Sequence, residues 1–77
     1  MHHARVSHSP RLRRVLTVLK DGGEHSSWEI AKRAKTVAPG TCVSELRANG
    51  AEIECRQDRS SGKTVFYYQM TKGPENA

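Results

Sequence analysis

Residues 39–50, PGTCVSELRANG, decide the fold. Pro39 suits the first turn of a helix but not its interior, so a helix is expected to begin there. Asn49-Gly50 supplies a turn and the glycine that commonly follows a helix C-terminus. On a helical wheel the apolar Cys42, Val43 and Leu46 share one face. The opposite face carries Thr41, Ser44 and Ala48, flanked by Glu45 and Arg47. The pattern predicts an amphipathic helix from about Pro39 to Asn49.

Two further helices are predicted upstream. Ser9-Pro10 combines an N-cap residue with proline at the first helical position. An apolar stripe at helical spacing follows, and Gly22-Gly23 ends it: Leu12, Val15, Leu16 and Leu19. Residues 26–29 form an S-x-x-E capping box that opens a second helix, which ends near Lys35. About four residues then separate the second and third helices, the length of a helix-turn-helix connection.

After Gly50 the apolar period changes from helical to two, which predicts a β-hairpin. Ala51, Ile53 and Cys55 alternate with charged residues, as in a half-buried strand. Residues 60–63 form a turn, and Thr64–Met70 is rich in β-branched and aromatic residues. Phe66, Tyr68 and Met70 are expected on one side of this second strand, and Tyr67 on the other.

The predicted fold class is α+β: a three-helix winged helix-turn-helix with a C-terminal two-stranded β-hairpin as the wing. Residues 9–71 form the domain, residues 1–8 a flexible basic arm and residues 72–77 a flexible tail. A chain of 77 residues has room for one modest core and little room for a deep catalytic cleft. Trp28 is expected at the edge of that core.

Composition excludes several functional classes. No apolar run approaches the ~18 residues of a membrane span, and the N-terminus lacks the apolar centre of a signal peptide, so a cytoplasmic protein is expected. Cys42 and Cys55 are interpreted as reduced core residues. The four histidines do not show the spacing of a metal site, and no cofactor is predicted. No serine has a histidine and an acid placed to activate it, so no enzymatic activity is expected.

The net charge of +5 is unevenly distributed. Positive charge is concentrated in three blocks, residues 1–20, 31–50 and 59–63, and acidic stretches at 21–30 and 51–58 separate them. A surface that faces phosphates would need such blocks to come together in the fold.

The chain resembles the small winged helix-turn-helix domains of phages and other mobile elements. The resemblance covers about three quarters of the chain, from Arg11 to Met70, and is closest over residues 43–50, VSELRANG. Residues 27–33, SWEIAKR, and the strand residues Ile53-Glu54 and 68–70 also follow the family pattern. Two features depart from it: Ala38-Pro39-Gly40 at the start of the third helix, and the acidic Glu45 beside the expected DNA face.

The resemblance implies a DNA-binding protein, either a transcriptional regulator or an excisionase-like accessory factor that bends DNA during recombination. The third helix is then expected in the major groove of double-stranded DNA, and the wing on the backbone. The candidate contacts are Thr41, Ser44, Glu45 and Arg47 in the third helix, Arg59, Ser60, Ser61 and Lys63 in the wing, and Arg11, Arg13 and Arg14 in the first helix. Glu45 either accepts from a cytosine amino group or pairs with a neighbouring charge.

The alternative hypothesis is a protein-interaction module of the same fold that binds and modulates a host protein. The acidic Glu52, Glu54 and Asp58 and an exposed Tyr67 favour it. Because no further helix is predicted after the wing to form a dimer, we expect a monomer that self-associates cooperatively on repeated DNA sites.

Overall fold

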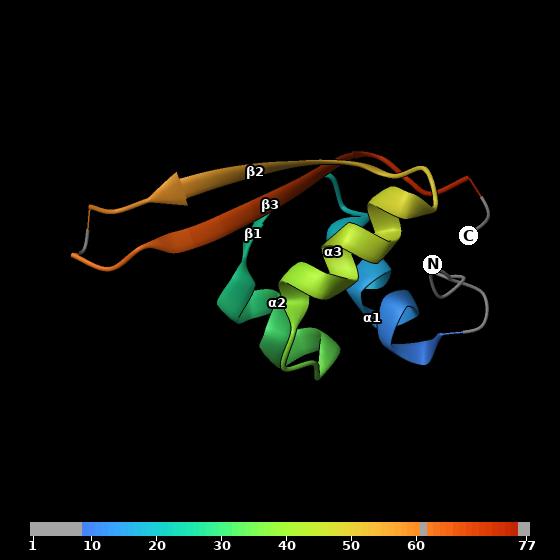
Figure 1. Cartoon of the computed structure of the whole chain (residues 1–77), viewed down its shortest axis with the longest axis horizontal. Coiled ribbons are helices and arrows are strands. Elements are labelled where there is room, and N and C mark those ends of the chain that lie inside the picture. Colours follow the sequence, from blue (N-terminus) through green and yellow to red (C-terminus); the bar gives the residue numbers. More distant parts are fainter. Residues whose placement is uncertain (1–8, 61, 76–77) are drawn as a thin grey trace.

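The computed structural model describes residues 9–60 and 62–75, and this part of the chain forms three helices and a three-stranded antiparallel sheet (Figure 1). The elements in chain order are α1 (Pro10–Leu19), β1 (Glu24–Ser26), α2 (Ser27–Ala34), α3 (Pro39–Ala48), β2 (Glu52–Asp58) and β3 (Val65–Lys72). This α+β arrangement is compatible with a winged-helix-like fold. Within the described ranges, no helix has the length and apolarity to cross a membrane.

The predicted helix starts are confirmed at atomic level. The Ser9 hydroxyl accepts a hydrogen bond from the Leu12 backbone N–H, and Pro10 occupies the first turn of α1. The Ser26 hydroxyl accepts from the Glu29 N–H at 3.1 Å, as the capping box predicts. Pro39 begins α3, whose N-cap Ala38 makes no side-chain hydrogen bond.

The predicted two-stranded hairpin is formed by β2 and β3, and β1 adds a third strand that was not predicted, giving the strand order β1-β3-β2. β1 pairs with β3 through the register Glu24 to Gln69, His25 to Tyr68 and Ser26 to Tyr67. Glu24-His25-Ser26 lacks β-branched residues and alternation, so nothing local predicts a strand there. The edge of β3 that β2 leaves unpaired supplies the hydrogen-bond partners of β1. The extended conformation of residues 24–26 therefore depends on tertiary pairing and not on the local sequence.

The core lies between the three helices and one face of the sheet. Its fully buried side chains come from all three helices: Leu12, Val15, Leu19, Ile30, Ala34, Cys42 and Leu46. Ile53 and Met70, opposite each other on β2 and β3, cover it from the sheet. The predicted inward faces of α1, α2 and α3 are therefore confirmed.

Three predicted core positions are exposed instead. Cys55 and Phe66 lie on the inward face of the hairpin, but the hairpin projects past the helices and leaves that part of the face uncovered (Figure 1). Trp28 is 79% exposed because the eight-residue α2 turns only Ile30 and Ala34 into the core. Cys42 is buried, as predicted.

The C-terminal segment returns to the end of α3. Lys72, assigned to the tail by the sequence prediction, is the last residue of β3. The Glu75 backbone N–H then donates to the Asn49 carbonyl at 2.9 Å. Gly50, at φ +99°, lies directly against Glu75 in this segment. The predicted arm at residues 1–8 and the final residues 76–77 lie outside the described residues.

Candidate nucleic-acid interface

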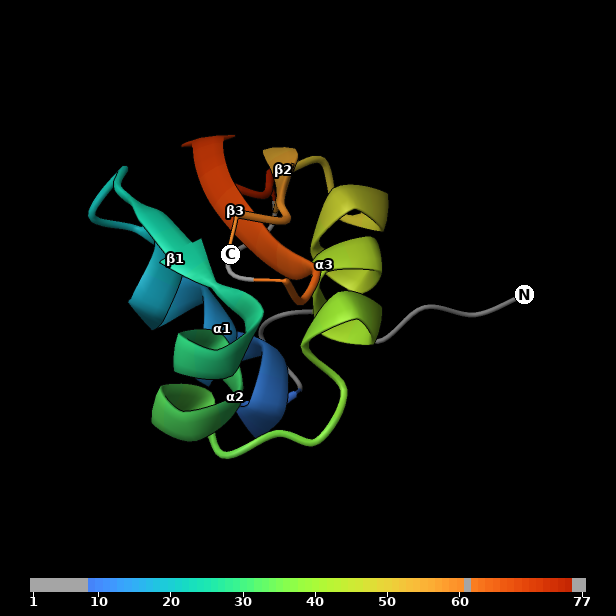
Figure 2. The same cartoon turned by 90° about the vertical axis from the view of Figure 1, so that its left-hand side faces the viewer.

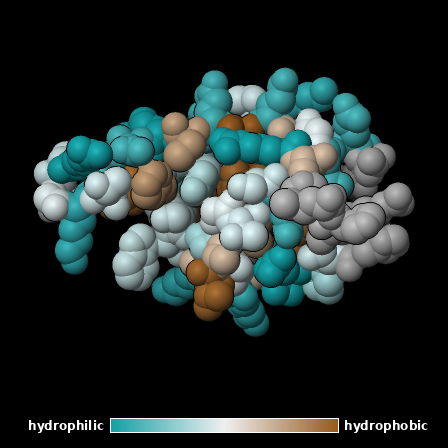
Figure 3. All heavy atoms as spheres, viewed as in Figure 1, coloured by the Kyte–Doolittle hydropathy of each residue, from teal (hydrophilic) through white to brown (hydrophobic). Residues whose placement is uncertain are grey.

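One side of α3 carries small, uncharged side chains, and no other helix or strand covers it in the part of the chain that the structure describes. Thr41, Ser44 and Ala48 are exposed there, and Gly40 continues the row toward the start of the helix. In Figure 2, α1 and α2 lie to one side of α3, and no other described helix or strand lies on the opposite side. In Figure 3, which views this side, near-neutral residues lie over the beginning of α3, with strongly hydrophilic residues above and below. We call Thr41, Ser44 and Ala48 the α3 stripe.

Arg11 and Glu45 form the border of the α3 stripe on the side of α1. One Arg11 guanidinium nitrogen donates to the Glu45 carboxylate at 3.2 Å. The Glu45 side chain is only 18% exposed, whereas that of Arg11 is 43% exposed. Of the two roles considered for Glu45, the structure shows pairing with a neighbouring charge. The acid is therefore partly neutralised, and it holds Arg11 next to α3.

Arg47 forms the opposite border, toward the sheet. Its guanidinium donates to the Ile53 carbonyl of β2 at 2.6 Å. This bond fixes the side chain across the junction between α3 and the hairpin. Arg47 is still exposed, so its remaining N–H groups face solvent beside the stripe. The guanidinium groups of Arg11 and Arg47 thus flank the α3 stripe.

The other two α1 arginines differ in their contacts. The Arg14 Nε–H donates to the Ala34 carbonyl at 2.7 Å, where a cation is favourable at the C-terminus of α2. Arg14 therefore has a structural role in joining α1 to α2. Arg13 is exposed and has no ion-pair partner within the described ranges.

The tip of the hairpin holds the predicted wing residues. The Asp58 carboxylate accepts from both the backbone N–H and the hydroxyl of Ser60, and these bonds lower the Asp58 pKa. Lys63 is exposed and unpaired in the part of the chain that the structure describes. The Arg59 side chain makes a 3.5 Å contact with the Gln57 side chain, and its carbonyl accepts from the Gly62 backbone N–H at 3.1 Å. Ser61 lies outside the described residues.

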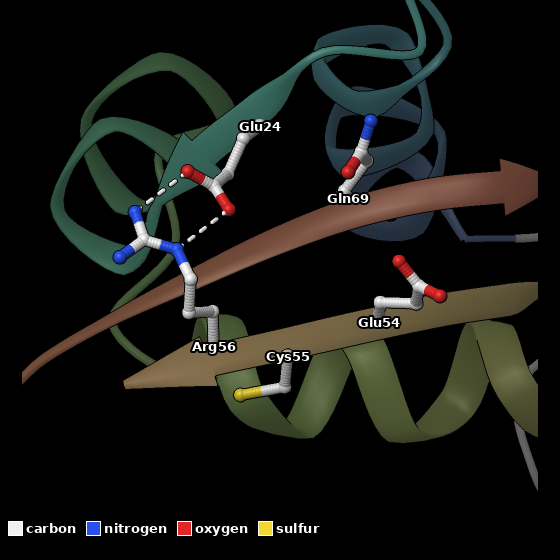
Figure 4. Close-up of a pocket in the computed structure, with 5 residues that line it drawn as sticks. All are labelled: Glu24, Glu54, Cys55, Arg56 and Gln69. Carbon is white, nitrogen blue, oxygen red and sulfur yellow. Dashed lines mark hydrogen bonds and ion pairs between the residues drawn. The ribbon is translucent and has the colours of Figure 1, made fainter. Parts of the chain in front are cut away.

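The outward face of the sheet, on the other side from the helices, carries charged side chains that pair with one another. Arg56 donates to both carboxylate oxygens of Glu24, at 2.7 and 3.0 Å, across a shallow pocket that Glu54 and Gln69 also line (Figure 4). This pairing lowers the pKa of Glu24 and raises the pKa of Arg56. The Arg56 guanidinium also stacks 4.6 Å from the centre of the Tyr67 ring. Tyr67 faces outward, as predicted, but it is half-buried beneath Arg56.

Sequence reasoning missed two features. Val37, in the turn before α3, is fully exposed, and no sequence signal distinguishes it from a core valine. His25 is buried between Asp21 and Glu29, at 2.8 to 3.0 Å from their carboxylates. The spacing of these residues, four apart on either side of His25, was available as a signal. Residues 9–60 and 62–75 contain no group of three or more side chains that is arranged to hold a metal ion.

Comparison of the chain with protein-family models, with curated proteins and with solved structures found no match.

Proposed function

We propose that this protein binds double-stranded DNA through a winged helix, with α3 in the major groove and the hairpin tip on the sugar-phosphate backbone. The supporting observation is the α3 stripe with Arg11 and Arg47 on its two borders. Small side chains let a helix approach base edges closely, and flanking guanidinium groups suit the phosphates on either side of a groove. A transcriptional regulator or an excisionase-like recombination factor of phage or mobile-element type is the role that the sequence resemblance favours.

Salt titration tests this proposal. The affinity for a short duplex is measured by fluorescence anisotropy between roughly 50 and 200 mM salt, where each phosphate contact contributes a slope of about −0.9 in log affinity against log salt. Four to six contacts would lower the affinity by roughly 10²- to 10³-fold over this range. Absence of binding at the lowest salt concentration would refute the proposal.

Lys63→Ala is expected to weaken binding to all duplexes about equally and to reduce the salt slope by about 1, since an exposed tip lysine contacts phosphate and not bases. Lys72→Ala is the matched control because Lys72 lies at the opposite end of β3. The same anisotropy titrations measure both variants. An unchanged slope for Lys63→Ala, or an equal loss for Lys72→Ala, would contradict the placement of the tip.

Glu45→Gln is expected to strengthen DNA binding by about three- to tenfold at low salt. The change removes a negative charge beside the groove and releases Arg11 from its ion pair. Glu54→Gln, on the outward face of the sheet, removes the same charge far from α3 and is expected to have a much smaller effect. Equal gains for the two variants would show that net charge alone, and not the position of Glu45, controls affinity.

A second candidate is the protein-interaction module. Glu52 and Glu54 are exposed on β2 and have no ion-pair partner among the described residues, which favours a basic protein partner on the sheet. A stoichiometric protein complex that is lost in a Glu52→Gln, Glu54→Gln double variant, together with no DNA binding at low salt, would favour this candidate.

A further inference from the structure

We infer that two copies of this chain associate by pairing their β2 strands, antiparallel and centred on Cys55, so that the two sheets join into one. The partner is therefore a second copy of the chain, and a two-fold axis brings the same strand of each copy together. The inference concerns the edge of the sheet and does not depend on DNA binding. Three features of the described residues support it: an open strand edge, an apolar face that the helices leave uncovered, and a charge pattern that is complementary to itself.

β2 is an edge strand of the described sheet and lacks the usual protection. In the strand order β1-β3-β2, no other described strand pairs with the outer side of β2, which lies along the border of the molecule in Figure 1. Natural sheets often block such edges with proline, lysine or a β-bulge. β2 contains neither proline nor lysine, and its register with β3 is regular from Ile53 to Asp58. The Ile53 carbonyl accepts from Arg47 but keeps a second lone pair, so this edge is able to accept a further strand.

The same part of the hairpin keeps apolar side chains in solvent. Cys55 is exposed and Phe66 is 37% exposed, both on the inward face where it extends past the helices. Tyr68, the β3 partner of Cys55, is half-buried. When two β2 strands pair about Cys55, the residues Tyr68 and Cys55 of one copy continue into Cys55 and Tyr68 of the other, in one row across four strands. Self-association therefore covers apolar surface that a single copy leaves exposed.

The charges beside Cys55 select this register. In an antiparallel pair centred on Cys55, Glu54 of each copy lies opposite Arg56 of the other on the outward face. Glu54 is exposed and has no ion-pair partner among the described residues. A centre at Glu54 or at Arg56 would place like charges opposite each other, and a shift by one residue would place the outward face of one copy beside the inward face of the other. Glu52 would lie opposite Asp58 of the second copy, which limits the pairing to residues 53–57.

Sedimentation velocity of the full chain, with a reducing agent present, tests the pairing. So short an edge is smaller than a standard protein interface, and we expect a monomer–dimer equilibrium with a Kd on the order of 0.1 mM. At the lower concentrations of the DNA titrations the chain is then monomeric. Glu54→Arg and Arg56→Glu each turn two attractive pairs into repulsive ones and are expected to weaken dimerisation at least about tenfold. An equimolar mixture of the two variants restores opposite charges at both pairs, so it is expected to dimerise about as well as the unmodified chain.

Two controls accompany these variants. Lys32→Glu, on the exposed side of α2, makes the same charge change as Arg56→Glu away from the sheet and is expected to leave dimerisation unchanged. Thermal unfolding checks that each variant folds, because Arg56→Glu also breaks the bond to Glu24. Glu54→Arg keeps that bond and therefore tests the inference even where Arg56→Glu fails to fold.

The exposed Cys55 thiol reports the register. Opposite residues of antiparallel strands have Cα atoms about 4.5–5.5 Å apart, which a disulfide can span. Cys42 is buried, so diamide is expected to link Cys55 to Cys55, taking up the two electrons and two protons that the thiols release. Both charge variants should slow this cross-linking, although their opposite charges would shift thiol reactivity in opposite directions. A chain that stays monomeric up to about 1 mM, variants that dimerise like the unmodified chain, or cross-linking rates that move in opposite directions would overturn the inference.

Discussion

Gly50→Ala is expected to lower the free energy of unfolding by about 2 kcal/mol, which corresponds to a fall in Tm of roughly 8–16 °C. Gly50 has φ +99°, a conformation that a residue with a Cβ adopts only with strain. An added Cβ would also lie 2.8 Å from Glu75 Cγ and 3.3 Å from the Glu75 backbone nitrogen. Both the turn after α3 and the returning C-terminal segment would have to shift. Chemical denaturation of the variant measures the loss.

Two further variants separate these causes. Gly73→Ala is the matched control because a Cβ there meets nothing within 4 Å, and its expected effect is within about 0.5 kcal/mol. Glu75→Ala in the Gly50→Ala background removes the side-chain clash and is expected to restore only part of the lost stability, since the backbone strain persists. Full recovery in the double variant would show that strain at φ +99° contributes little.

The free energy of unfolding is expected to fall as the pH rises through the pKa that His25 has in the folded protein. Burial lowers the pKa of His25, but hydrogen bonds to Asp21 and Glu29 outweigh it, and the pKa lies above its usual 6.5. A raised pKa means that the histidine stabilises the fold fully below pH 6.5 and loses this contribution as the pH passes the folded-state value. The same hydrogen bonds to His25 lower the pKa values of Asp21 and Glu29, so the contribution of these carboxyls is lost as the pH falls below their ordinary values of 3.8 and 4.5. The cluster is therefore most stabilising between about pH 4.5 and 6.5.

His25→Gln tests this cluster. At pH 5.5 the variant is expected to lose about 2 kcal/mol, because two hydrogen bonds between charged groups are removed from a buried ring. At pH 8.5 the loss should be smaller, and the variant should show a flatter stability profile between pH 6 and 9. Urea denaturation across this range measures both effects. A parallel profile for the unmodified chain and the variant would assign the pH dependence to another group.

The helices were predictable because their signals are local. Ser9-Pro10, the Ser26 capping box and Pro39 each place a specific hydrogen bond or dihedral angle at a helix start, and the apolar spacing follows. β1 was not predictable, because its pairing depends on β3, more than forty residues away in the chain. The exposure of Cys55 and Phe66 was missed for a similar reason: alternation identifies the face of a strand but not how far the covering helices extend.

The candidate site was predictable in its residues but not in its internal bonds. The free side of α3 follows from the helical wheel, which placed Thr41, Ser44 and Ala48 opposite the core. The partners of Arg47 and Arg14 are backbone carbonyls, of Ile53 and Ala34, and a carbonyl carries no signature in the sequence. The pairing of Arg11 with Glu45 joins two helices 34 positions apart, so only the tertiary structure reveals it. These bonds engage, within the protein, part of the guanidinium groups that the sequence analysis assigned to DNA contacts.

The strand order has a consequence for how the protein folds. β3 is the central strand and also the last of the described elements, so β1 and β2 both remain without their partner until residues 65–72 are available. A chain that grows from its N-terminus can form the three helices early, since their contacts are comparatively local. It cannot form the sheet or cover the core with Met70 at that stage. The β2–β3 hairpin closes a short turn, whereas the pairing of β1 with β3 closes a loop of about forty residues and is expected to form later. β2 lies at the edge of the described sheet, so its outer edge is able to pair with another chain both during folding and afterwards.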